Sequence, residues 1–200
     1  MTEHPILFSA PMVRAILAGR KTQTRRVIKP QPILVDDRTW TWPCDGVGSK
    51  SSWASGWKPY PDGMDRFCPY GQATKQLWVK ETCWFDPRYK PSVCYRADGE
   101  MPEHMTGARW TPSRFMPRWA SRLLLEITEV RVQRVQDISE EDAQAEGCDG
   151  DCPIGYIPAY QEGPYSYHYA QVWHSLNAKR GYGWDLNPWV WAISFRRIEP

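Results

Sequence analysis

Long apolar segments are missing from this 200-residue chain, and so is a large excess of charge of either sign. No run reaches the roughly 20 apolar residues of a membrane-spanning helix, and residues 1–11 lack the apolar core of a signal peptide. The 25 basic and 23 acidic side chains leave a net charge of +2, so only a local cluster of cations can attract nucleic acid. We expect a cytoplasmic protein with no membrane partner.

Familiar catalytic signatures are absent as well. The chain has no GxGxxG fingerprint, no Walker loop, no HExxH pair and no GxSxG elbow, which argues against the enzyme classes that these motifs mark. Its predicted helices and strands do not alternate regularly, so a Rossmann-type sheet is not expected. We expect no cofactor and no metal in a catalytic centre.

The six cysteines follow no pairing rhythm and contain no CxxC motif. In a cytosolic protein such cysteines are most simply free thiols. A structural zinc site remains an alternative for four of them, namely Cys44, Cys68, Cys148 and Cys152.

Tryptophan and proline, by contrast, are abundant, with 12 and 18 residues. Indole rings can supply packing surface where regular structure is sparse, or can stack on bases. Prolines gather with glycine and serine in residues 29–66. This composition predicts an irregular insertion there, within one domain that spans residues 1–200.

Periodicity and capping signals predict three helices. Ser9 and Pro11 open the first, and Gly19 suits its left-handed end. Ser139 opens the second, which Gly147 closes. The third spans residues 165–180 and has an apolar face formed by Tyr169, Val172, Trp173 and Leu176. Strands are predicted at 5–8, 24–28, 77–81, 93–96, 123–132 and 189–197, which indicates an α+β fold built as a compact mixed barrel.

The run GRKTQTRR, residues 19–26, places four cations and two hydroxyls just after the first helix. Such a cluster at a helix exit can hold a phosphate or build a catalytic site. It can equally be a solvated basic strand. The residues alone leave both interpretations open.

The same stretch carries a family resemblance. Residues 16–25, ILAGRKTQTR, resemble the GxKxxExR-like signature of the ASCH (activating-signal-cointegrator homology) superfamily. Segments 5–30, 77–82, 95–99, 116–122 and 137–147 are similar to a prophage-associated ASCH-like group. The resemblance implies a PUA-like β-barrel flanked by short helices, with long irregular insertions. It also implies a monomer that binds a nucleoside or single-stranded RNA.

Within this superfamily, the small bacterial N(4)-acetylcytidine amidohydrolases carry a similar GRKT-x-T run. The resemblance places their general base on Lys21, their nucleophile on Thr24 and their proton donor on Glu146. A threonine hydroxyl needs a base before it attacks, and a lysine is a base only when its pKa is lowered by burial or by nearby positive charge. Lys21 and Thr24 fall on opposite faces of an ideal strand, so they converge only if the chain still turns after Gly19.

The remaining candidates are substrate-binding residues. Arg20, Arg25 and Arg26 can supply the positive charge that lowers the pKa of the lysine. Further candidates are Glu81, Arg118, Trp119, Ser121 and Arg122, with the tryptophan stacking on a base. Each of these can also be a packed or solvated residue. We further expect at least three of five cations to line one groove: Lys21, Arg25, Arg26, Arg118 and Arg122.

Three functions follow from the resemblance. The first is an amidohydrolase that deacylates N(4)-acetylcytidine or a related acylated pyrimidine. The second is a ribonuclease on single-stranded RNA, in which Lys21, Arg25 and Arg26 stabilise phosphate charge. The third is a non-catalytic module that binds RNA or a modified base.

Overall fold

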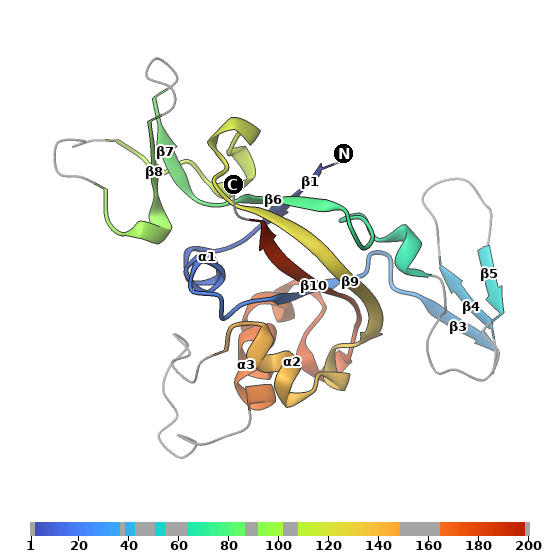
Figure 1. Ribbon diagram of the computed structural model, residues 1–200. Coiled ribbons are helices and arrows are strands. Elements are labelled where there is room, and N and C mark those ends of the chain that lie inside the picture. Colours follow the sequence, from blue (N-terminus) through green and yellow to red (C-terminus); the bar gives the residue numbers. More distant parts are fainter. Residues whose placement is uncertain are drawn as a thin grey trace.

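A five-stranded mixed sheet forms the centre of the computed structural model (Figure 1). The structure describes residues 3–36, 39–42, 51–54, 64–86, 92–101, 108–148 and 165–198. Across the sheet the strands are β1 (Glu3–Leu7), β6 (Gln76–Lys80), β9 (Leu124–Arg134), β10 (Trp189–Ile198) and β2 (Gln23–Val27). The β1–β6 pair is parallel and the other pairs are antiparallel.

Both faces of β10 are covered, which makes this strand the centre of the core. Trp191, Ile193 and Phe195 alternate toward the main cluster, which also contains Ile6, Val13, Leu77 and Leu125. Val190 points the other way, toward a second cluster with Tyr169 and Trp173. A strand with two buried faces reads as a continuous apolar run, as WVWAI does here.

Helix α1 (Ala10–Leu17) connects the two edge strands, β1 and β2. It buries Val13, Ala15 and Ile16. Ser9 occupies the predicted N-cap position, but its side chain forms no capping hydrogen bond. Gly19 adopts a φ of +73° as expected, a conformation that a residue without Cβ reaches at little cost.

Two further helices pack against each other and contribute to the second cluster, apart from α1 (Figure 1). Helix α2 (Glu140–Ala145) begins at Ser139, whose hydroxyl accepts a hydrogen bond from the Asp142 amide, as predicted. Helix α3 (Tyr165–Asn177) is followed by a 3₁₀ turn. Short 3₁₀ segments occur at Met64–Phe67, Arg96–Asp98, Ser113–Phe115, Arg118–Ala120, Val135–Asp137, Ala178–Arg180 and Trp184–Leu186.

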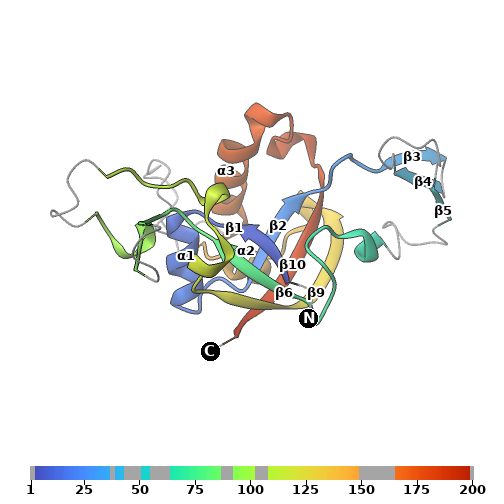
Figure 2. The same ribbon diagram turned by 90° about the horizontal axis from the view of Figure 1, so that it is seen from above.

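Two smaller β elements lie on opposite sides of the central sheet in both views (Figures 1 and 2). One is a hairpin of β7 (Cys83–Phe85) and β8 (Val93–Tyr95). The other is a three-stranded sheet of β3 (Ile33–Asp36), β4 (Thr39–Trp42) and β5 (Ser51–Ala54). The expectation of little regular structure in residues 29–66 is therefore wrong for these strands. The Thr-Trp alternation at 39–42 was the available strand signal.

The sheet does not close into a barrel in the described part of the chain. Strand β1 pairs only with β6, and β2 pairs only with β10, so both remain edges. The established architecture is thus α+β with an open mixed sheet. The described residues contain no helix long and apolar enough to cross a bilayer.

Candidate functional site

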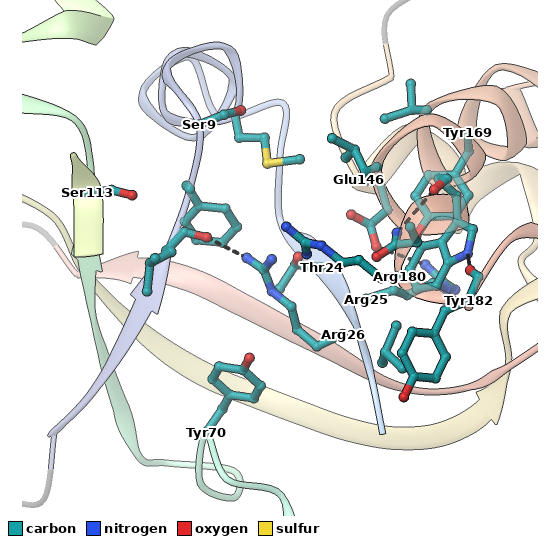
Figure 3. A pocket seen from close by; sticks show the side chains of 18 of the residues that line it. Ser9, Thr24, Arg25, Arg26, Tyr70, Ser113, Glu146, Tyr169, Arg180 and Tyr182 are labelled. Atoms are coloured by element: carbon teal, nitrogen blue, oxygen red, sulfur yellow. Dashed lines mark hydrogen bonds and ion pairs between the residues drawn. The ribbon is translucent and has the colours of Figure 1, made fainter. Parts of the chain in front are cut away.

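A pocket of about 620 Å³ lies between the edge strands β1 and β2, beside α3 (Figure 3). One wall is formed by Phe8 from the end of β1 and by Thr24, Arg25 and Arg26 from β2. Residues of α3 form the facing wall. This space is where a closed barrel would have paired the two edge strands.

The side chain of Arg26 spans the gap between β1 and β2, which do not pair with each other through backbone hydrogen bonds in the described sheet. Its Nη2 donates a hydrogen bond of 2.6 Å to the carbonyl oxygen of Leu7. Its guanidinium also lies 5.1 Å from the ring centre of Phe8, a distance that allows a cation–π interaction. One side chain therefore joins the two edges and leaves room for a ligand beside it.

The apolar face predicted on the third helix is divided between the core and the pocket. Tyr169 and Trp173 are buried in the second cluster and also line the pocket, and Leu176, which is 52% exposed, lines it with Val172. An apolar and aromatic wall of this kind suits a flat heterocycle.

Lys21 is fully buried next to this pocket. Its ammonium donates three hydrogen bonds, of 2.7 Å to the carbonyl of Gln23, 2.8 Å to the carbonyl of Glu146 and 2.7 Å to Oε2 of Glu146. Burial lowers the pKa of Lys21, while the charge and the hydrogen bond of Glu146 oppose that shift. Each of the three ammonium protons thus has an acceptor. Burial nevertheless makes it easier for the ammonium to lose one of these protons.

The chain is still turning at Lys21. The backbone amides of Arg20 and Lys21 both donate to the carbonyl of Ala15, and β2 starts only at Gln23. Lys21 and Thr24 therefore do not alternate along one strand. Lys21 contacts Glu146, and Thr24 and Glu146 both line the pocket.

Further charged side chains around Glu146 hold its carboxylate in position. Arg25 is fully buried and pairs with Asp142 at 2.6 Å and with Glu146 at 3.4 Å. Arg131 reaches the same Asp142 carboxylate at 3.1 Å, and Gln23 donates to it at 3.0 Å. Burial acts to raise the pKa of Asp142, but these hydrogen bonds and the charge of Arg25 outweigh it and lower the pKa.

Thr24 is buried in the wall. Its hydroxyl forms no hydrogen bond with any described residue. A hydroxyl with that freedom can turn toward a ligand carbonyl or toward a base.

Six of the predicted substrate-binding residues do not line this pocket. Glu81 is buried in an ion pair with Arg122 at 2.9 Å, and Arg122 also pairs with Asp98. Burial raises the pKa of Glu81, which Arg122 opposes. Arg118 pairs with Glu3 instead. Trp119 packs edge-on against Phe85, and Ser121 donates to the carbonyl of Val79. Arg20 is exposed at the exit of α1.

The expectation of one groove with three of the five named cations is wrong. Only Arg25 and Arg26 line the pocket. Lys21 lies next to it, and Arg118 and Arg122 are held elsewhere by carboxylates.

Sequence reasoning missed two sets of residues. The first is the carboxylate of Asp142 with its partners Gln23 and Arg131. The second is a set of further pocket-lining residues, namely Lys29, Tyr70, Ser113, Arg180 and Tyr182. Only the acidic start of the second predicted helix signalled the first set, and no local pattern signalled the second.

No group of three or more His, Cys, Asp or Glu side chains suited to a metal occurs among the described residues. Of the four cysteines considered for zinc, Cys68 is buried and Cys148 is half-buried. Burial raises the pKa of the Cys68 thiol to about 11. Cys44 and Cys152 lie outside the described residues.

Comparison with known proteins gives little further constraint. No family model matches the chain, and no curated protein does. Among solved structures, the chain is similar to protein EF3133 from Enterococcus faecalis V583, described with the family name DUF984. The two share 11% sequence identity and a TM-score of 0.43, with 99% of this chain and 82% of the other covered. The ASCH resemblance remains a hypothesis that rests on the sequence motifs.

Proposed function

We propose that the pocket binds a nucleoside and that Thr24, Lys21 and Glu146 deacylate N(4)-acetylcytidine or a related acylated pyrimidine within it. One observation carries this proposal. The Lys21–Glu146 contact of 2.7 Å lies at the wall of a pocket that Thr24 also lines. The three residue types match those of the ASCH amidohydrolases that the sequence resembles.

The close contact supplies the base and the acid together. Burial disfavours the ammonium form of Lys21, which favours transfer of one of its protons to the Glu146 carboxylate oxygen 2.7 Å away. The transfer leaves a neutral amine and a carboxylic acid. The first can act as a base and the second as a proton donor.

The proposed reaction proceeds in two halves and returns Lys21, Thr24 and Glu146 to their starting protonation states. The amine of Lys21 takes the hydroxyl proton of Thr24, whose oxygen attacks the acyl carbonyl. Glu146 protonates the departing N4 amine as the carbon–nitrogen bond breaks, which leaves an acyl ester on Thr24. In the second half, the Glu146 carboxylate takes a proton from water as the water oxygen attacks the acyl carbon of the ester. The bond between that carbon and the threonine oxygen breaks, and the ammonium of Lys21 returns a proton to this oxygen as the carboxylic acid leaves.

The dimensions of the pocket agree with such a substrate. Its volume of about 620 Å³ falls within the range typical of small-ligand sites. The α3 wall offers Trp173 and Leu176 to the flat base, while polar groups of β2 lie opposite. No metal is required by these steps.

A second candidate is a non-catalytic module for RNA or a modified base. The complete set of acceptors around the Lys21 ammonium favours it, because such a set stabilises the charged lysine. In this case Lys21 and Glu146 only hold the wall of the pocket in shape.

One assay separates the candidates. Purified protein is incubated with N(4)-acetylcytidine, and release of cytidine and acetate is followed by chromatography. A labelled single-stranded RNA is treated in parallel. Cytidine release that depends on enzyme concentration supports the amidohydrolase, RNA cleavage supports the ribonuclease, and binding without either product supports the module. Turnover of acylated nucleosides at the background rate would refute the amidohydrolase.

A further inference from the structure

The charges that line the pocket do not balance. Four of the described lining residues are cations, Arg25, Arg26, Lys29 and Arg180, and one is a carboxylate, Glu146. Arg25 is paired with Asp142, and Glu146 is already paired with Lys21. Within the described residues, the lining of the pocket therefore carries more positive than negative charge.

Three cations account for the excess. Among the described residues, the side chain of Arg26 donates a hydrogen bond only to the uncharged carbonyl of Leu7. Lys29 lies 5.0 Å from the ring centre of Tyr182, and no carboxylate within the described ranges pairs with it. Arg180 likewise has no ion pair or hydrogen bond to a described residue. In Figure 3 its side chain extends from the α3 side into the pocket.

Like charges around one partly enclosed space repel each other more strongly than they would in bulk water. Such an arrangement raises the energy of the empty pocket and lowers the energy of a bound anion. Guanidinium groups suit phosphate in particular, since their forked N–H donors match its oxygens.

We infer that the ligand of this pocket carries a phosphate, held by Arg26, Lys29 and Arg180, so that the substrate is a nucleotide or a nucleotide unit of RNA rather than a free nucleoside. The nucleoside part of this inference rests on the proposed function. The phosphate part rests only on these three cations, which pair with no carboxylate in the described part of the chain. Arg26 comes from the β2 wall and Arg180 follows the α3 wall, so the phosphate lies between the two walls.

The test is a binding titration by calorimetry with cytidine, cytidine 5′-monophosphate, a short single-stranded oligocytidine and inorganic phosphate. We expect the wild-type protein to bind the monophosphate at least ~10-fold more tightly than cytidine, a difference of about 1.4 kcal/mol, because guanidinium and ammonium groups form charge-assisted hydrogen bonds with the phosphate. The preference should shrink as salt is raised from about 50 to 500 mM, because ions screen the attraction. Tighter binding of the oligonucleotide would assign the phosphodiester of RNA, and tighter binding of the monophosphate would assign the monoester. Either result supports the inference.

Matched variants locate the phosphate. Arg180→Gln and Lys29→Gln should each reduce the preference for the monophosphate over cytidine by ~3-fold or more. Lys179→Gln is the control, because this exposed cation is next to Arg180 in sequence but does not line the pocket. The preference of Lys179→Gln for the monophosphate over cytidine should equal that of the wild-type protein. An equal loss in Lys179→Gln would instead indicate a nonspecific surface effect and overturn the assignment.

Failure of this inference is distinguishable from failure of the proposed function. Equal affinity for cytidine and its monophosphate, or no binding of any phosphate-bearing ligand, overturns the phosphate site even if acetylcytidine is hydrolysed. Tight nucleotide binding without any deacylation overturns the amidohydrolase and leaves the phosphate site standing.

Discussion

The ammonium of Lys21 lies 2.7 Å from Oε2 of Glu146, although 125 positions separate them in the chain. Neighbouring contacts hold the two segments together. The amide of Thr22 donates to the carbonyl of Ala145 at 2.9 Å, so the exit of α1 and the end of α2 form one unit. The pair is therefore set by backbone contacts as well as by its own charges.

Replacement of Thr24 by valine tests the nucleophile. Thr24→Val deletes the hydroxyl, nearly preserves the side-chain volume and keeps a β-branched residue in β2. The hydroxyl has no partner among the described residues, so we expect an unfolding midpoint near that of the wild type. Deacylation should fall at least ~10³-fold, since no acyl ester can form. Chromatography of the reaction and urea denaturation give the two measurements, and retained turnover would remove Thr24 from the mechanism.

Replacement of Lys21 by arginine separates a base from a fixed cation. A guanidinium keeps its positive charge at all accessible pH values, so it cannot take the proton of Thr24. Lys21→Arg should therefore abolish deacylation. A ribonuclease that needs only a cation would retain much of its activity, and kcat on both substrates decides between them. Urea denaturation controls for misfolding, because the larger head group must fit the fully buried position of Lys21.

Much of the local structure can be predicted from the sequence. The presence and order of α1, α2, α3 and the central strands follow from periodicity, Ser139 and the two glycines at 19 and 147, while the observed ends differ by a few residues, as in α3, which ends at Asn177. Closure of the sheet could not be predicted, because local patterns do not specify whether the edges β1 and β2 pair. The Lys21–Glu146 contact came from the family resemblance alone. The Arg180 position could not be predicted either, since tertiary packing of α3 brings it to β2.

Arg122 was expected to bind substrate, but its ion pair with buried Glu81 predicts a structural role. Arg122→Ala leaves the Glu81 carboxylate buried without its partner. We expect the free energy of unfolding to fall by about 3 kcal/mol. This is the lower end of the range for breaking a buried ion pair, because Arg122 is 25% exposed. Arg118→Ala, which breaks a more exposed pair with Glu3, is the control and should cost less than about 1 kcal/mol. Urea denaturation measures both, and equal costs would contradict this assignment.

The lowered pKa of Asp142 predicts that the folded protein loses stability in acid. Its pKa is lowered below 3.8 in the folded protein, so the folded state binds this proton less readily than the unfolded state. The stabilisation is complete above pH 3.8 and is lost as the pH falls through the folded pKa. Asp142→Asn should lower stability at pH 7 and flatten the decline below about pH 4. Urea denaturation across pH 2–7 tests this, with the exposed Asp185→Asn as control. An unchanged slope in Asp142→Asn would contradict it.

Gly147 follows Glu146 at the end of α2, and its backbone conformation allows α2 to approach α1 closely. It has a φ of +87°, and a Cβ there would lie 3.1 Å from Cβ of Lys21 and 3.2 Å from Cβ of Ala15. Gly147→Ala must therefore strain the backbone and push α2 away from α1, which costs about 2–3 kcal/mol in total. Gly19→Ala is the matched control, because its φ of +73° carries the same backbone strain but its Cβ would meet no atom within 4 Å. We expect it to cost about 1 kcal/mol.

The two glycine variants should also differ in activity. A shift of Glu146 away from Lys21 lengthens the path of the proton, so kcat for deacylation should fall in Gly147→Ala by more than its loss of folded protein explains. Gly19→Ala should retain kcat, since it leaves the contact between the helix ends intact. Measurement at a temperature where both variants are folded separates the effects. If both variants lost kcat equally, the Lys21–Glu146 distance would not control the reaction, and the pair would hold the pocket in shape without moving a proton.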